Sequence, residues 1–466
     1  MGLEQVTAQR LRRGTAMLAA VLAVAALASP AAGAITPPEV DPDTAPPSGA
    51  AGPVQTMTQR GACTVTGVIP GTDPGAVSPN QLTLNLTEAW RHSRGDGQTV
   101  AVIDTGVQPG PRLPNVEPGG DFVAGSDGLT DCDGHGTMVA GLIAGQPGAD
   151  GFSGVAPGAQ LLAIRQTSAR YSPNQPGQDP VIVEASNDIA TLARAVVRAA
   201  DLGARIINIS SVACVPANTS IDQSALGAAL RYAAVDKDVV IIAAAGNTGG
   251  GIAGGTACAA NPLTDPARPD DPRNWAGVTS VSTPSWWQPY VLSVGALNPG
   301  GQPAPFSMSG PWLGLAAPGE NIASVSNNPD GGLANGQPNE QGELAPVSGT
   351  SYAAAYVSGV AALVRSRFPE LSAEQVVRRL TSTARGADRS PSSLVGAGTI
   401  DPVAALTWDV PGPGSPAEPT RPVAAPPEPA HQDSTPRTVA YIGTGVLALA
   451  AIVTAIAAHR RKDTAA

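Results

Sequence analysis

The sequence predicts an α/β fold in which a mostly parallel sheet is flanked by helices, and two observations lead to this prediction. Short runs of Val, Ile and Ala alternate along the chain with segments of helical periodicity. The strand-like runs are almost continuously apolar, which is expected of parallel strands covered by helices on both faces. The alternation is confined to residues 85–408, so we expect this stretch to form one domain.

The individual elements follow from local patterns. Strands are predicted at 99–103, 160–164, 205–209, 239–244 and 291–294, and helices at 135–143, 187–202, 224–235, 351–365 and 372–381. A short helix is predicted at 86–92 with Asn85 as its N-cap. Two long connections, 166–183 and 248–289, interrupt the alternation, and long connections in a compact domain are usually functional or mobile.

Composition excludes several classes of function. The chain of 466 residues has a formal net charge of -10, and only 14% of its residues are charged. It contains no long block of Lys or Arg, so nucleic acid is not an expected partner. Its four cysteines include no Cys-x-x-Cys pair, which argues against a zinc or redox motif, and we predict no metal or other cofactor.

The first 34 residues have the layout of a secretory signal peptide. Arginines precede an apolar run, and small residues follow it through Ala34, after which cleavage is expected. The next segment, 35–84, is rich in Pro, Ala, Gly and Thr and has no sustained period. It predicts an irregular N-terminal arm, with disorder as the alternative.

A second apolar segment predicts one C-terminal transmembrane helix. Residues 439–458 carry no charge over about 20 residues, the length that a bilayer core requires, and a basic tail follows at 459–466. The positive-inside rule places the tail in the cytoplasm and the globular domain outside the cell membrane. Pro-rich residues 409–438 are expected to form an extended linker. A buried core helix is the alternative interpretation of the apolar segment.

Three short segments supply an acid, a base and a nucleophile. Asp104 ends an apolar strand, His135 opens a helix of small residues, and Ser351 lies at the N-terminus of another such helix. A serine hydroxyl becomes reactive when an imidazole takes its proton and a buried carboxylate orients that imidazole. Taken singly, Asp104 is explained by an Asx-turn and His135 by a cap or core histidine. Together the three residues favour nucleophilic catalysis.

The order Asp, His, Ser is the order found in subtilisins. Four motifs occur in sequence: Val-Ala-Val-Ile-Asp104-Thr-Gly-Val, Gly-His135-Gly-Thr-Met-Val-Ala-Gly, Ala-Ala-Ala-Gly-Asn247 and Ser-Gly-Thr-Ser351-Tyr-Ala-Ala-Ala. On these motifs the chain resembles the subtilisin-like serine proteases, which implies their three-layer fold and endopeptidase activity on proteins or peptides. The resemblance implies that Asp104 orients His135, that His135 is general base and then general acid, and that Ser351 attacks the peptide carbonyl.

The same resemblance assigns roles to residues near strand ends. Asn247 is similar to the oxyanion-hole side chain that acts with the backbone N–H of Ser351, and a turn residue is the alternative. The segment containing Asn208 and Ser210 resembles the edge on which substrate backbone pairs as an added strand. Val212 stands where many members have glycine, so primary specificity stays open.

Two acidic residues precede His135 in the sequence. Asp131 and Asp133 either shape the substrate side of His135 or solvate a loop, and we favour the loop.

The four cysteines are expected to form disulfides in an oxidising compartment. Four cysteines allow three connectivities. Cys63 lies in the arm and Cys132 just before His135, so a Cys63–Cys132 bridge would staple the arm beside the active site. Cys214 and Cys258 would then brace two loops near the specificity pocket. We favour this connectivity over the other two.

The whole layout resembles the mycosins, the membrane-anchored subtilases of mycobacterial and related actinobacterial type VII secretion systems. The resemblance implies two roles, processing of secreted substrates and stabilisation of the secretion membrane complex. The alternatives are a docking subunit with an occluded protease site and a general cell-surface subtilase.

Overall fold

A computed structural model describes residues 35–174, 180–249, 258–263, 265, 267–268, 270–339, 341–386, 392–411, 441–451 and 453–454. The chain divides into two compact units, Met1–Val410 and Pro411–Ala466. The predicted signal peptide, the basic tail and most of the predicted linker lie outside the described residues. The first unit contains both the arm and the domain predicted at 85–408, so the arm is part of the globular body.

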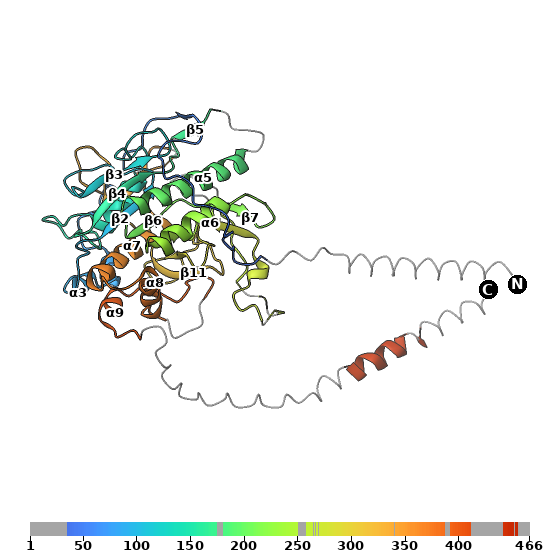
Figure 1. Ribbon diagram of the computed structural model, residues 1–466. Coiled ribbons are helices and arrows are strands. Elements are labelled where there is room, and N and C mark those ends of the chain that lie inside the picture. The colour runs from blue at the N-terminus through green and yellow to red at the C-terminus, as the bar shows by residue number, and fades with distance from the viewer. Residues whose placement is uncertain are drawn as a thin grey trace. The chain divides into compact units, whose positions relative to one another are not determined.

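A seven-stranded sheet is the centre of the first unit (Figure 1), as far as the described residues go. Its strands lie in the order β11-β10-β8-β6-β2-β4-β3, and every neighbouring pair is parallel. The bounds are β2 Thr99–Asp104, β3 Val116–Asp121, β4 Gln160–Arg165, β6 Ile206–Ile209, β8 Val240–Ala244, β10 Val291–Leu297 and β11 Leu313–Pro318. The chain builds the sheet on one side of β2 and then crosses to the other side at β6. Ligands bind at such a switch point in open α/β sheets.

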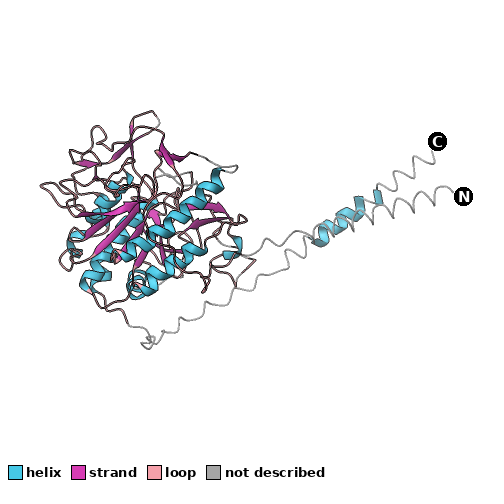
Figure 2. Cartoon of the chain, turned by 45° about the horizontal axis from the view of Figure 1, so that its top comes forward, coloured by secondary structure: helices cyan, strands magenta, loops and turns pink. Residues whose placement is uncertain are grey.

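Helices cover both faces of this sheet (Figure 2), which gives the three-layer architecture that the sequence predicted. Alternate residues of β2 show why both faces are apolar. Val100 and Val102 pack with α4 (His135–Ala144) and α7 (Thr350–Arg367) on one face, whereas Ala101 and Ile103 pack with α5 (Pro180–Asp201) and α6 (Ser224–Arg231) on the other. Side chains of a strand alternate between faces, so a strand covered twice must be apolar throughout.

The remaining described elements are short. The helices are α2 Pro79–Thr83, α3 Leu86–Ala89, a π-helix at Tyr232–Asp236, a 3₁₀-helix at Trp275–Gly277, α8 Ala373–Ser382 and α9 Pro402–Thr407. Antiparallel pairs form between β1 (Met57–Gln59) and β5 (Tyr171–Pro173), β7 (Ala213–Pro216) and β9 (Ser280–Thr283), β12 (Ser324–Val325) and β13 (Leu333–Ala334), and β14 (Gly336–Pro338) and β15 (Leu344–Pro346).

Two predictions about individual elements need refinement, and two strands were missed. Helix α5 begins at Pro180 and therefore takes up the end of the connection predicted at 166–183. Asn85 is the N-cap residue of α3 as predicted, but its backbone has a left-handed φ of 49° and its side chain makes no capping hydrogen bond. The two edge strands of the sheet, β3 and β11, were not predicted, because both contain Gly and Pro and neither has the continuous β-branched run of a central strand.

The arm is ordered and packed over its described residues, 35–84. Its strand β1 pairs with β5, and the backbone N–H of Thr64 donates to the carbonyl of Cys132 at 2.8 Å. Buried Thr66 exchanges hydrogen bonds with Asn327, at 3.0 Å from its N–H to Asn327 Oδ1. Helix α2 begins with a capping box formed by Ser78 and Gln81. The arm was predicted as irregular, and this description fits the segments between these short elements.

Two disulfides confirm the favoured pairing. Cys63 bonds to Cys132, which ties the arm to the loop before α4, and Cys214 bonds to Cys258. Cys214 lies on β7, which pairs with β9 next to the end of β6.

The predicted membrane helix is described only in part. Residues 441–451 and 453–454 are helical, and the rest of 439–458 lies outside the described residues. No helix in the described part of the chain is both long enough and apolar enough to span a bilayer. The transmembrane helix therefore stays a prediction from the sequence.

The Cys63–Cys132 bond should contribute strongly to stability. The double variant Cys63→Ser/Cys132→Ser should lose about 2–4 kcal/mol of unfolding free energy, because the bond restricts the unfolded chain. Urea denaturation of the purified proteins measures this loss. The matched control is Cys214→Ser/Cys258→Ser, whose sequence separation is 44 rather than 69. Only the first variant should expose the arm to limited proteolysis, and an arm that stays protected would contradict the stapling role.

Candidate functional site

Asp104 is the last residue of β2 and lies at the carboxyl edge of the sheet. Its side chain has 0% exposure. Oδ1 of Asp104 accepts the backbone N–H of Thr105 at 2.7 Å and also contacts Nδ1 of His135 at 2.7 Å. The strand end thus holds a buried carboxylate against an imidazole.

His135 is the first residue of α4, and the local backbone explains how it reaches Asp104. Gly134 precedes it with a φ of 77°, a conformation that an L side chain rarely adopts. A Cβ at Gly134 would also lie 2.7 Å from Thr66 of the arm. The ring nitrogen that does not face Asp104, Nε2, lies 2.8 Å from Oγ of Ser351.

Ser351 is the second residue of α7, a helix buried on all sides for most of its length. Small residues make this burial possible, and a Cβ at Gly359 would lie only 2.5 Å from Val155. Ser351 is 5% exposed. It lies in the first turn of α7, where the backbone N–H groups have no partner within the helix. The structure therefore brings together all three residues that the sequence selected.

Charge compensation decides the protonation of the Asp104–His135 pair. Burial alone raises the pKa of Asp104, but the charge of His135 and hydrogen bonds from His135, Ser210 and Thr105 lower it below its ordinary value. Burial lowers the pKa of His135, but the charge and hydrogen bond of Asp104 raise it above 6.5. The resulting pair is a carboxylate beside an imidazole that gains a proton readily.

Asp131 is a structural part of the site, which corrects the prediction of a solvated loop. Its buried carboxylate accepts hydrogen bonds from the hydroxyls of Thr105 and Thr137 at 2.9 and 2.7 Å. It also accepts the N–H groups of Asp133, Gly134 and Thr137. Burial raises the pKa of Asp131 to about 6 despite these bonds. The carboxylate joins the loop after β2 to the start of α4.

Asp133 is also buried and faces away from solvent. It accepts the hydroxyl of Ser168 and the N–H of Ala169, the latter at 3.0 Å. Burial raises the pKa of Asp133 against these hydrogen bonds and the charge of Arg165. The charges of Asp131 and Asp133 add to that of Asp104 in raising the pKa of His135.

Asn247 follows β8 and is held by α7. Its Oδ1 accepts both the N–H and the hydroxyl of Thr350 at 3.0 Å. Because the amide oxygen is engaged, the Nδ2 group of Asn247 remains the group that can donate to an oxygen bound beside Ser351. This arrangement is what an oxyanion hole requires.

The side chain of Asn208 lies in the core between the sheet and α7. It has 0% exposure, accepts the hydroxyl of Ser358 at 2.9 Å and donates to Oγ of Ser210 at 2.9 Å. Any contact with substrate in this segment would therefore come from its backbone or from residues after Asn208.

Tyr352 is a component of the site that we did not select from the sequence. It follows Ser351, is 1% exposed, and its ring centroid lies 5.1 Å from that of His135. The Tyr352 ring therefore packs against one side of the His135 imidazole. The sequence signal that could have identified Tyr352 was its position directly after Ser351.

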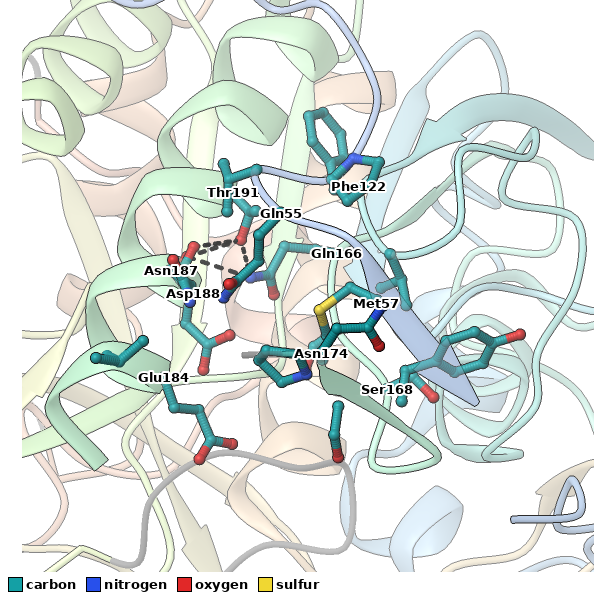
Figure 3. Close-up of a pocket in the computed structure, with 18 of the residues that line it drawn as sticks. Gln55, Met57, Phe122, Gln166, Ser168, Asn174, Glu184, Asn187, Asp188 and Thr191 are labelled. Carbon is teal, nitrogen blue, oxygen red and sulfur yellow. Dashed lines mark hydrogen bonds between the residues drawn. The ribbon is translucent and has the colours of Figure 1, made fainter. Parts of the chain in front are cut away.

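A cavity of about 410 Å³ lies between the arm, α5 and the segment after β4 (Figure 3). The arm supplies Gln55 and Met57 to its lining, and α5 supplies Asp188. Another lining residue, Gln166, donates its backbone N–H to the carbonyl of Asp104 at 2.8 Å, so the cavity adjoins the strand that carries the acid. Burial, with a smaller effect of the Glu184 charge, raises the pKa of Asp188 to about 7.

Within the described residues, no group of three or more His, Cys, Asp or Glu side chains is arranged to hold a metal ion.

Residues 95–398 match the subtilase family. The chain is also 62% identical over 459 residues to Mycosin-3 of Mycobacterium tuberculosis, covering 97% of this chain and all of the relative. The chain is a subtilase of the mycosin family. Mycosin-1 of Mycolicibacterium smegmatis is 45% identical over 466 residues, covering 97% of this chain and all of that relative. Membership in this family makes the protein a serine endopeptidase.

Solved structures that are similar to this chain agree with this assignment. The MycP3 protease from the type VII (ESX-3) secretion system is 70% identical with a TM-score of 0.78, covering 80% of this subtilase and all of that chain. A chain of an intact ESX-5 inner membrane complex is 47% identical with a TM-score of 0.78, covering 91% of this subtilase and all of that chain.

Asn247→Leu should impair turnover more than binding. Removing an oxyanion-hole donor lowers kcat by about 10²–10³-fold while KM changes little, because the oxyanion exists only in the transition state. Steady-state hydrolysis of a fluorogenic peptide measures both constants. Asn298→Ala, in the turn after β10, is the control and should leave kcat unchanged. A Leu variant with parental kcat would contradict the assignment.

Activity should rise with pH as His135 loses its proton. Protonated imidazole cannot accept the proton of Ser351, so the rate is low below the pKa of His135 and high above it. Because the pKa of His135 is raised, the midpoint should lie above 6.5. Initial rates across the pH range measure it, and a rate that is flat from about pH 5 to 9 would contradict this role for His135.

Proposed function

We propose that this subtilase cleaves peptide bonds with Ser351 as nucleophile, His135 as general base and acid, and Asp104 as the orienting carboxylate. The observation that carries the proposal is the unbroken series of contacts, 2.7 Å from Asp104 to His135 and 2.8 Å from His135 to Ser351. An isolated Ser–His contact would be weak support. The buried carboxylate completes the set because it holds the imidazole in one tautomer.

The reaction follows from the positions of these groups. Nδ1–H of His135 donates to Asp104, so Nε2 accepts the proton of Ser351 as Oγ attacks the carbonyl carbon. The new oxyanion accepts hydrogen bonds from Nδ2 of Asn247 and the N–H of Ser351. His135 then gives its proton to the leaving amine. Water then takes the place of the amine: it gives a proton to His135 as its oxygen attacks the acyl carbon. The bond between Oγ and the acyl carbon breaks, and His135 returns the proton to Ser351.

The substrate is an extended protein segment that pairs with the backbone following β6. Ser210 to Val212 form the connection between β6 and β7, next to the carboxyl edge of the sheet. Strand addition at such an edge supplies affinity through backbone hydrogen bonds and leaves specificity to side-chain pockets.

We further propose that the protease acts outside the cell membrane as a component of a type VII secretion membrane complex, where it processes secreted substrates. The predicted signal peptide, C-terminal transmembrane helix and basic cytoplasmic tail support this location. A relative of 47% identity belongs to a solved ESX-5 inner membrane complex. The same relationship favours a second role, stabilisation of that complex, which does not require peptide hydrolysis.

A fluorophosphonate probe tests the proposed catalysis directly. The probe modifies a serine whose base and oxyanion hole are assembled and accessible, so the full chain in detergent should be labelled and Ser351→Ala should not. Intact-protein mass spectrometry measures the modification. Ser309→Ala is the matched control, since Ser309 is another buried serine and its hydroxyl donates to the carbonyl of Asn261.

Each outcome has a distinct meaning. Labelling of the parent and the control alone would establish Ser351 as the nucleophile. An unlabelled but folded parent would reject accessible catalysis. The structural role is separable, because a deletion strain complemented with Ser351→Ala should regain secretion if the complex needs only the folded protein. Failure of that complementation would reject a role independent of catalysis.

A further inference from the structure

Resting on the proposed function, we infer that Asn208 and Ser358 are positioning residues that aim the hydroxyl of Ser210 at the second oxygen of Asp104. This role differs from contact with substrate. Helix α7, which carries Ser351 at its start, would then also support Asp104 through Ser358, Asn208 and Ser210.

Asp104 has one oxygen that the rest of the site leaves without a partner. Oδ1 receives His135 and the N–H of Thr105, both at 2.7 Å. Oδ2 is buried and has no hydrogen bond within normal distance among the described residues. A buried carboxylate oxygen without a donor is costly, so a nearby hydroxyl with a free proton would stabilise it.

Ser210 is the neighbour that can supply this proton. Its backbone N–H donates to the carbonyl of Ile103, the residue before Asp104, at 3.4 Å. Its hydroxyl lies near enough to the Asp104 carboxylate to help lower the pKa of that group, although it completes no hydrogen bond with Oδ2. Ser210 is 7% exposed, so solvent offers little competition for the hydroxyl.

Asn208 determines which way the Ser210 hydroxyl points. Its Nδ2 donates to Ser210 Oγ at 2.9 Å and therefore occupies a lone pair of that oxygen. The hydroxyl proton cannot point toward this donor and is left for another acceptor, and Asp104 Oδ2 is the buried acceptor that needs it.

Ser358 determines the orientation of Asn208. Its hydroxyl donates to Asn208 Oδ1 at 2.9 Å, which fixes the amide oxygen toward α7 and the amide nitrogen toward Ser210. Both side chains have 0% exposure. Ser358 lies two turns after Ser351 on α7, so one rigid helix positions the nucleophile and supports the acid.

The test compares Ser210→Ala, Ser358→Ala and the double variant, each in the full chain. In Ser210→Ala no hydroxyl can neutralise part of the negative charge on Asp104. The carboxylate therefore stabilises protonated His135 more strongly. The pH midpoint of fluorophosphonate labelling should rise by about 0.3 or more, and the maximal labelling rate should fall about 10-fold. Ser358→Ala should change both quantities in the same direction and by less, about 3-fold in rate.

The double variant distinguishes an effect of Ser358 that is transmitted through Ser210 from an effect that is independent of Ser210. If Ser358 acts through Ser210, the double variant should label at the rate of Ser210→Ala alone. Ser309→Ala serves as the control for loss of a buried serine hydroxyl and should leave the midpoint unchanged. Thermal melting verifies that each variant is folded, and removal of one hydroxyl oxygen is the mildest available change.

Three results would overturn the inference. These are an unchanged midpoint in Ser210→Ala, rate losses that multiply in the double variant, and a shift in the control equal to that of Ser358→Ala. An unlabelled parent would reject the proposed catalysis and the positioning role with it. A labelled parent with unaffected variants would reject the positioning role alone.

Discussion

A carboxylate withdrawn completely from water must find its donors within the protein, and the site around Asp104 is organised by this requirement. Asp104 has 0% exposure, yet its pKa is lowered because His135, Ser210 and Thr105 stabilise the charged form. Each donor comes from a different segment: the start of α4, the residue after β6 and the residue after β2. The parallel sheet makes this convergence possible because the carboxyl ends of its strands meet at one edge.

Sequence patterns predicted the central strands, the long helices and the three residues that meet at the candidate site, because each has a strong local signal. A buried parallel strand is continuously apolar, and a reactive serine or histidine at the start of a small-residue helix stands out from its neighbours. Edge strands β3 and β11 lack that signal because they carry Gly and Pro. The burial of Asp131 and Asp133 depends on contacts with Thr137 and Ser168, which no periodicity encodes.

The arm and the loop before His135 form one structure. Asn327 donates to the carbonyls of both Thr64 in the arm and Asp131 in the loop before His135, at 2.8 and 3.1 Å. The Cys63–Cys132 bond joins the same two segments covalently. A disordered arm would have left this loop with unsatisfied polar groups, so the packing observed here follows from the need to satisfy buried backbone groups.

Burial of α7 has a consequence for the order of assembly. The helix packs against β6, β8, β10 and β11 and also contacts α4, so it covers one face of a sheet whose seven strands all precede it in the chain. In a chain that emerges N-terminus first, Asp104 and His135 are released long before Ser351. The three residues therefore cannot meet until the chain has emerged as far as α7. Completion of the site coincides with insertion of the last long helix of the core, so an N-terminal fragment that ends before α7 would hold the acid and the base but no nucleophile.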